Sequence, residues 1–227
     1  DIFKDFDEVP FKSASIGQVH RATLHNGKQV VVKLKRPGIY DIMKSDTNTV
    51  RKILNFVQSI GIDTGSSSNF VLNDSIEYLL GESDYVQEVE NAIKFRRSLK
   101  DVDWIKIPRV YKKYCTDEMI VMEYVPTEKI TEVKNKKINK KKVCEALVNS
   151  YVIQTMETGL FHADPHPGNL GVSKNGKLVF YDFGLLIKLT DELKQGFADL
   201  FAGIIKRDTR TIVKILIGLG VIVPTSS

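Results

Sequence analysis

The sequence predicts an α+β fold with two lobes, a β-rich N-terminal lobe with inserted helices and a short helical C-terminal lobe. Strand-like runs joined by a tight turn open the chain, apolar residues at helical spacing close it, and a short apolar stretch bridges the two parts. We place the N-terminal lobe at 1–122, a hinge at 123–126 and the C-terminal lobe at 127–227. Ligands usually bind in the cleft between two such lobes, so we expect one there.

The N-terminal lobe begins with a predicted β-hairpin. Two strand-like runs, 18–24 and 29–34, flank Asn26-Gly27, a favoured hairpin turn because both positions tolerate positive φ. Apolar residues at helical spacing then predict a helix over 39–60. After a Gly/Ser-rich loop at 61–69, the remaining elements expected in this lobe are helices at 70–80 and 84–99 and strand-like segments at 105–110 and 118–125.

The C-terminal lobe is predicted to be mostly helical around a loop with two prolines. A polar, lysine-rich connection at 126–142 leads to a helix over 143–159, and Gly159 suits the position just past a helix end. The elements expected after it are a loop at 162–171, a short strand at 177–181 and amphipathic helices at 191–206 and 209–219.

Composition narrows the classes of function. The chain has 227 residues, 42% hydrophobic and 27% charged, which is ordinary for a folded globular protein. Its net charge of +5 is concentrated in six lysines between Lys134 and Lys142, so we do not expect a nucleic-acid binder. Cys115 and Cys144 form neither a disulfide framework nor a metal set. The apolar stretch at 212–223 is shorter than the roughly 20 residues of a membrane span.

The strongest functional signal is the segment His-Ala-Asp-Pro-His-Pro-Gly-Asn at 162–169, followed by Asp-Phe-Gly at 182–184. Its spacing matches the H-R-D-x-x-x-x-N and D-F-G motifs of protein kinases. Phosphoryl transfer needs a carboxylate beside the acceptor oxygen, which suits Asp164, and hard oxygen ligands for Mg²⁺, which suit Asn169 and Asp182. The sequence therefore predicts a protein-kinase-like fold that uses ATP and Mg²⁺.

Segments upstream fit the same pattern. Lys33 ends the run Val-Val-Val-Lys and matches the V-A-I-K lysine that holds the α- and β-phosphates. Against G-x-G-x-x-G-x-V, the loop keeps only Gly17 and Val19, and Ala14 replaces the second glycine. A Cβ at Ala14 limits backbone approach to a phosphate, so we expect altered nucleotide preference or slower transfer. The expected nucleotide contacts are Ala14, Ser15, Gly17, Val19 and Lys33, with Glu123 and Val125 of the hinge beside the adenine.

A phosphate-binding lysine of this kind needs an acidic partner on a neighbouring helix. The candidates are Glu77, Glu82, Glu88 and Glu90. Spacing does not choose among them, and each read alone is an ordinary solvated charge on a helix.

The combined motifs resemble the UbiB family of atypical kinases, also called AarF-domain-containing kinases, over nearly the whole chain. The stretch 13–20 resembles the family's alanine-rich nucleotide loop, Glu-Ser-Asp-Tyr at 82–85 its E-x-D-Y helix, and 162–169 its H-x-D-P-H-P-G-N loop. The resemblance implies that Glu82 pairs with Lys33. It associates Glu88 instead with an N-terminal K-x-G-Q extension, which this sequence does not contain, and we expect the C-terminal lobe to be incomplete.

The resemblance also implies a function and a setting. It implies an ATP-binding atypical kinase or ATPase that supports prenylquinone (ubiquinone-like) or lipid metabolism, in mitochondria, plastids or the bacterial cytoplasm. The implied partners are a nucleotide and a small-molecule, prenylquinone-precursor or lipid substrate. The lysine run at 134–142 adds the hypothesis of peripheral contact with an anionic membrane, beside the simpler interpretation of a solvated loop.

Two alternatives stay open. A protein kinase acting on Ser/Thr of a protein partner would need an activation segment, but no A-P-E follows Gly184, and Ala163 replaces the arginine of H-R-D. A catalytically weak nucleotide-binding scaffold would not need the intact set of Lys33, Asp164, Asn169 and Asp182. The missing A-P-E and the intact set of four residues therefore favour the atypical kinase or ATPase over these two alternatives.

Overall fold

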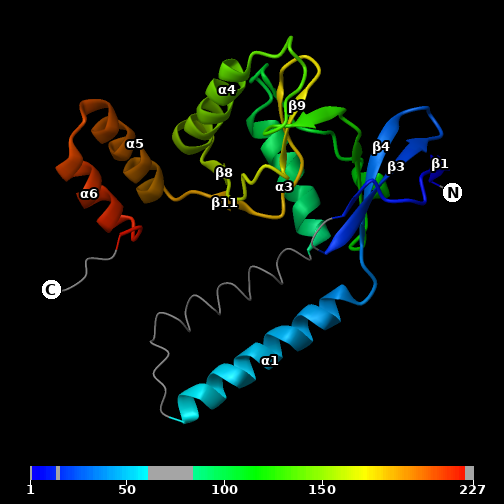
Figure 1. Ribbon diagram of the computed structural model, residues 1–227, viewed down its shortest axis with the longest axis horizontal. Helices are drawn as coiled ribbons and strands as arrows, with labels where there is room; N and C mark the ends of the chain where they lie inside the picture. The colour runs from blue at the N-terminus through cyan, green and yellow to red at the C-terminus, as the bar shows by residue number, and fades with distance from the viewer. Residues whose placement is uncertain (1, 14–15, 61–83, 223–227) are drawn as a thin grey trace. The chain divides into compact units, whose positions relative to one another are not determined.

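The computed structural model describes residues 2–13, 16–60 and 84–222 (Figure 1), so the loop predicted at 61–69 and the helix at 70–80 lie outside it. The described chain forms two compact units. The first takes its residues from 1–94, 108–125 and 182–184, and the second from 95–107, 126–181 and 185–227. The chain thus leaves the first unit inside the segment predicted as the hinge. The units are not contiguous lobes, because 95–107 joins the second and 182–184 the first.

The first unit is built on an antiparallel sheet in the order β1-β3-β4-β6, with β2 paired to β3 (Figure 1). The strands are β1 (Phe3–Phe6), β2 (Lys12–Ser13), β3 (Gly17–Leu24), β4 (Gln29–Lys35) and β6 (Met119–Glu123). The predicted hairpin is confirmed, with Gly27 at a φ of 79° in its turn. Alternate residues cover opposite faces, as the pleat requires. Val30, Val32 and Val121 pack on one face, and Ile120 and Met122 on the other.

Two helices that lie wholly or mostly in the first unit match their predicted segments. Helix α1 (Ile39–Ser59) follows β4, and α3 (Tyr85–Ser98) presents Tyr85 and Val89 to the sheet face that carries Ile120 and Met122. Asp84 begins α3 because its side chain accepts a hydrogen bond from the backbone N–H of Gln87 at 2.9 Å, as an N-cap residue does. A short 3₁₀ turn, η1 (Lys112–Tyr114), precedes β6.

The described part of the second unit contains strands within the predicted segments 105–110 and 177–181, and four further strands that were not recognised in the sequence. A four-stranded sheet has the order β5-β10-β9-β7, and β8 pairs with β11. These strands are β5 (Ile105–Lys106), β7 (Thr127–Lys129), β8 (Leu160–His162), β9 (Leu170–Ser173), β10 (Leu178–Phe180) and β11 (Leu186–Lys188). The connection predicted at 126–142 thus holds β7, and its Val133 and Ile138 are buried against Val172 of β9. Two to four residues are too few to show a strand period in the sequence.

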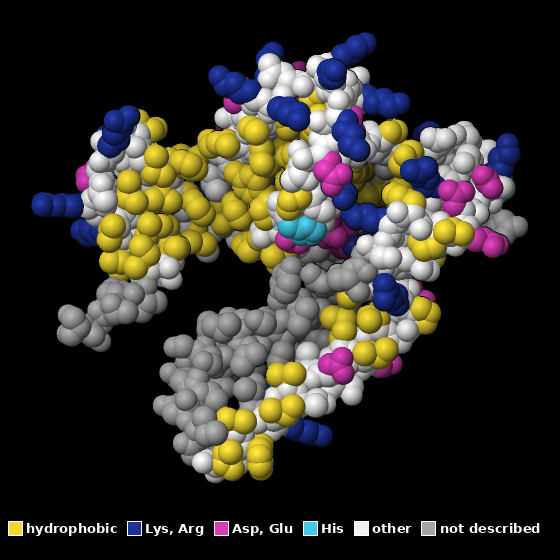
Figure 2. Space-filling model, in the orientation of Figure 1, with side chains coloured by type: hydrophobic (Ala, Val, Ile, Leu, Met, Phe, Trp, Pro, Cys, Tyr) yellow, Lys and Arg dark blue, Asp and Glu magenta, His cyan; other side chains and the backbone are white. Residues whose placement is uncertain are grey.

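The helices of the second unit lie close to their predicted positions. They are α4 (Lys140–Ile153), a π-helical turn η2 (Gln154–Thr158), α5 (Asp191–Lys206) and α6 (Thr209–Gly218). Asn139 caps α4 by accepting from the backbone N–H of Lys142 at 3.2 Å, and Gly159 ends η2 at a φ of 63°. Helices α5 and α6 pack side by side, and hydrophobic side chains gather on the face shown in Figure 2.

Candidate active site

The ammonium of Lys33, on β4, is enclosed by two carboxylates of the first unit. Its Nζ donates to Oε1 and Oε2 of Glu88 at 3.0 and 2.8 Å and to Oδ2 of Asp182 at 3.1 Å. Three acceptors match the three N–H donors of an ammonium. The side chains of Lys33 and Glu88 are only 10% and 2% exposed, so solvent screens this pair little.

In this triad of Lys33, Glu88 and Asp182, the charges shift the pKa values of Lys33 and Glu88. Burial lowers the pKa of Lys33, but the charges of Glu88 and Asp182 outweigh it and raise the pKa above its ordinary value. Burial raises the pKa of Glu88 to about 7, against the attraction of Lys33 and with the repulsion of Asp182. Lys33 therefore stays cationic, which is the state that a phosphate-binding lysine requires.

Backbone pairing and α3 together set the position of the triad. Lys33 lies opposite Val19 on β3 and opposite Ile120 on β6. The Asp-Phe-Gly segment is attached to α3 because Asn91 Nδ2 donates to the Phe183 carbonyl at 2.9 Å. Phe183 is fully buried, and the N–H of Gly184 donates to Asp182 Oδ1 at 3.0 Å. Asp182 is therefore oriented by its own turn as well as by Lys33.

Among the described residues, the acidic partner that a neighbouring helix supplies to Lys33 is Glu88. Glu82, which the resemblance assigned to this role, lies outside the described residues. Glu88 shares a buried stripe of α3 with Tyr85, Ala92 and Phe95 at helical spacing, and that stripe is the sequence signal that could have singled it out. Glu90 lies off the stripe and forms an ion pair with Lys112 at the surface.

Asp164 and Asn169 are brought together in the second unit. Asn169 Nδ2 donates to Asp164 Oδ2 at 2.9 Å and to the Asp164 carbonyl at 3.2 Å. Asn169 is 6% exposed, whereas the Asp164 side chain is 34% exposed. A buried amide thus orients a carboxylate that remains accessible, as a proton acceptor for a substrate hydroxyl or a water must be.

Two residues that the sequence reasoning missed hold the start of this loop. The N–H of His162 donates to Gln154 Oε1 at 2.8 Å, and Tyr151 Oη donates to the His162 carbonyl at 3.2 Å. Gln154 opens the π-helical turn η2, and such turns inside helices occur often at functional sites. The His162 ring is buried and packs against Phe95 and Phe180.

The residues predicted to contact the nucleotide differ in their burial, and two of them lie outside the described residues. Ala14 and Ser15 lie outside the described residues, Gly17 is buried, and Val19 is half-buried. At the predicted hinge, the N–H of Glu123 already donates to the Arg109 carbonyl at 2.8 Å. Val125 is half-buried at the end of this segment, so adenine binding there stays a prediction that rests chiefly on Val125.

Gly17 is required by close packing. A Cβ on Gly17 would lie 2.5 Å from the Leu34 carbonyl oxygen and 2.6 Å from the Tyr85 hydroxyl. We expect Gly17→Ala to lower the free energy of unfolding by about 1–3 kcal/mol, as overpacked cores do, measured by urea denaturation. Gly218→Ala is the matched control, because nothing lies within 4 Å of its added Cβ. Equal stability of Gly17→Ala and the unmutated protein would contradict this packing.

Each of the two units carries an oxygen donor of the kind that Mg²⁺ takes. Asp182 offers a carboxylate, and the amide of Asn169, whose nitrogen is directed at Asp164, offers its oxygen. Mg²⁺ prefers oxygen ligands and is usually held by one or two protein groups together with substrate phosphates. Among the described residues no cluster of three or more His, Cys, Asp or Glu side chains could hold a metal ion. The two oxygen donors are the type that a phosphate-bound Mg²⁺ takes.

The fold and these residues define a kinase-like protein, and the chain belongs to the ABC1 atypical kinase-like family. The model of the ABC1 atypical kinase-like domain matches residues 1–216. The resemblance to UbiB and AarF-domain kinases is therefore confirmed, and so is the kinase-like α+β fold.

The chain is similar to two named relatives and to one solved structure. It is 34% identical, over 99% of its length, to Protein ACTIVITY OF BC1 COMPLEX KINASE 7, chloroplastic, of Arabidopsis thaliana. It is 33% identical, over 96% of its length, to Probable protein kinase UbiB of Erwinia tasmaniensis. The chain spans 33% and 42% of these relatives. Rv3197 of Mycobacterium tuberculosis, solved in complex with erythromycin, shares the fold with a TM-score of 0.71 at 23% identity, over 95% of this chain and 55% of that one.

Proposed function

We propose that this chain binds ATP with Mg²⁺ and transfers or hydrolyses the terminal phosphoryl group. The observation that carries the proposal is the buried ion pair of Lys33 with Glu88, joined by Asp182 at 3.1 Å. A lysine with this burial and these partners keeps its charge and its position, and a phosphate-binding lysine needs both.

Each residue takes a role that its surroundings support. Lys33 would hold the α- and β-phosphates, with Glu88 fixing its direction. Asp182 and Asn169 would supply oxygen ligands to Mg²⁺, which when bound neutralises charge on the phosphates. Asp164, oriented by Asn169, would accept the proton of the attacking hydroxyl or water.

The substrate is proposed to be a small or lipid-linked molecule such as a prenylquinone precursor. The chloroplastic and bacterial relatives favour a plastid or bacterial setting. All six lysines between Lys134 and Lys142 are exposed, which allows contact with anionic lipid at about 1 kcal/mol per basic residue. Within the part of the chain that the structure describes, no helix combines the length and hydrophobicity needed to cross a bilayer.

The nucleotide site is tested by Asp182→Asn. We expect Mg-ATP at about 100 times its Kd to raise the stability of the unmutated protein by about 2.7 kcal/mol. The variant should lose the Mg²⁺-dependent part of that gain, because an amide is a weaker Mg²⁺ ligand than a carboxylate. Thermal unfolding with ATP, with and without Mg²⁺, measures both, and exposed Asp103→Asn is the control. A full Mg²⁺-dependent gain in Asp182→Asn would remove this residue from the metal site.

Turnover separates the proposal from its alternatives. ATP hydrolysis is measured with and without anionic liposomes, a prenylquinone-precursor mimic and a generic protein acceptor. Stimulation by the liposomes or the mimic supports the proposed substrate class. Phosphate transfer to Ser/Thr of the protein acceptor would favour a protein kinase, and binding of Mg-ATP without turnover would favour a scaffold.

A further inference from the structure

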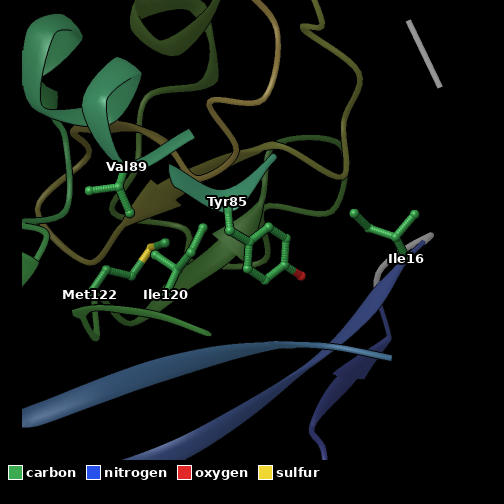
Figure 3. Close-up of a cluster of buried hydrophobic side chains, with 5 residues drawn as sticks. All are labelled: Ile16, Tyr85, Val89, Ile120 and Met122. Carbon is green, nitrogen blue, oxygen red and sulfur yellow. The ribbon is translucent and has the colours of Figure 1, made fainter. Parts of the chain in front are cut away.

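Tyr85, the first residue of α3, has a buried hydroxyl that no residue of the described structure hydrogen-bonds. The residue is 0% exposed and belongs to the cluster with Ile16, Val89, Ile120 and Met122 (Figure 3). Its ring packs with this cluster, while the hydroxyl points toward Ile16 and away from Val89 and Met122. A phenylalanine would satisfy the packing equally well, so the hydroxyl calls for an explanation of its own.

Tyr85 lies beside Lys33 and Lys35, and these surroundings are called the lysine site. The ring centroid lies 5.1 Å from Nζ of Lys33 and 4.9 Å from Nζ of Lys35. Lys33 and Lys35 are two residues apart on β4, so their side chains lie on the same face of the sheet, the face that α3 covers. Burial, with the charges of Glu88 and Asp182 and against that of Lys33, raises the pKa of Tyr85 to about 12. The phenol therefore stays protonated near neutral pH and can donate a hydrogen bond.

The same hydroxyl lies against the nucleotide loop. A Cβ on Gly17 would come within 2.6 Å of it, so the hydroxyl oxygen packs directly beside the α-carbon of the one glycine that the loop retains. The neighbouring Ile16 is 5% exposed and seals that side of the cluster. An O–H donor to which the described residues offer no acceptor is thus placed beside both the predicted phosphate loop and the lysine proposed to bind phosphate.

We propose that Tyr85 is a phosphate-binding residue, whose hydroxyl donates a hydrogen bond to a phosphate oxygen of the nucleotide that Lys33 holds. The inference rests on the proposed nucleotide function and adds a residue to it. A phosphate oxygen would supply the acceptor that the described residues do not give this hydroxyl, and Lys33 and Lys35 supply positive charge beside it. The backbone at Gly17 must shift off the hydroxyl when the nucleotide binds, which a residue without a Cβ permits most easily.

Tyr85→Phe tests the proposal because it removes only the oxygen. We expect the Kd for Mg-ATP, measured by calorimetric titration, to rise about tenfold or more, since a hydrogen bond to a charged acceptor is lost. The affinity for adenosine, which has no phosphate, should not change. The melting temperature of the ligand-free protein should stay the same or rise, because the variant loses an unsatisfied buried hydroxyl. Tyr114→Phe, on η1, is the control for a tyrosine outside the lysine site.

These measurements distinguish failure of the Tyr85 proposal from failure of the proposed nucleotide function. Unchanged Mg-ATP affinity in Tyr85→Phe would overturn the proposal, as would an equal loss for adenosine. A lower melting temperature without ligand, together with unchanged Mg-ATP affinity, would show a purely structural hydroxyl and overturn it too. If the unmutated protein itself binds no Mg-ATP, the proposed nucleotide function fails, and this inference fails with it.

Discussion

Replacement of Lys33 by methionine is expected to lower the free energy of unfolding by about 3–5 kcal/mol and to abolish Mg-ATP binding. The substitution leaves Glu88, whose side chain is 2% exposed, without its cation and beside the second carboxylate of Asp182. A buried charge deprived of its partner costs far more than an exposed one. Urea denaturation and calorimetric titration with Mg-ATP measure the two losses.

The stability deficit of Lys33→Met should depend on pH in a defined direction. The pKa of Glu88 is already raised to about 7 in the folded protein, and loss of Lys33 removes the attraction that opposes this rise. The folded variant then retains a proton that the folded unmutated protein releases. Stability falls with pH where the folded state binds more protons, so the deficit should be larger at about pH 9 than at about pH 6.

Lys4→Met is the matched control for this prediction, because Lys4 is an exposed lysine on a strand of the same sheet. Its stability should change by less than about 0.5 kcal/mol, as surface substitutions usually do. If Lys33→Met were as stable as Lys4→Met, the ion pair with Glu88 would contribute nothing to the fold. If it also bound Mg-ATP normally, Lys33 would not be the phosphate-binding lysine.

Asp164→Asn is expected to retain Mg-ATP binding and to lose turnover by about 10²–10⁴-fold, the usual contribution of a general base. An asparagine keeps the size of the side chain and an oxygen that can accept from Asn169 Nδ2, so the loop geometry should survive. It cannot take up the proton of the attacking group. Steady-state turnover and the Kd for Mg-ATP, measured on the same preparation, separate the two effects.

The control for this variant is Asp101→Asn, because the side chain of Asp101 is 88% exposed and its carboxylate lies 4.0 Å from the ammonium of Lys100. It should match the unmutated protein in both measurements. Equal turnover in Asp164→Asn would remove Asp164 as the proton acceptor. Loss of binding in parallel with turnover would instead assign it a role in holding the nucleotide.

Local patterns predicted most of what the structure contains. The Asn26-Gly27 turn, the alternation along β3 and β4, and the periodicity of α1 and α5 depend on neighbours in the sequence, and these elements were placed within a few residues. The pairing of Asp164 with Asn169 follows from a fixed short spacing on one loop. Such features need no knowledge of the rest of the chain.

Features that depend on distant contacts were harder to predict. Several glutamates were compatible with Lys33 by spacing, and the role of Glu88 emerges only from the buried face of α3. The strands β7 and β9 pair with each other across about 40 residues, and neither is long enough to show a period. The hydroxyl of Tyr85 carries no signal in the sequence at all, because its position depends on β3, β4 and α3 packing together.

Release of phosphate from Mg-ATP tests the central claim most directly. It is measured for the unmutated protein, Lys33→Met and Asp164→Asn, with and without Mg²⁺ and with anionic liposomes as an added condition. We expect Mg²⁺-dependent turnover by the unmutated protein and loss of that turnover in both variants. No turnover by the unmutated protein under any of these conditions, or equal turnover by all three proteins, would contradict the roles in phosphoryl transfer proposed for Lys33, Glu88, Asp182, Asp164 and Asn169.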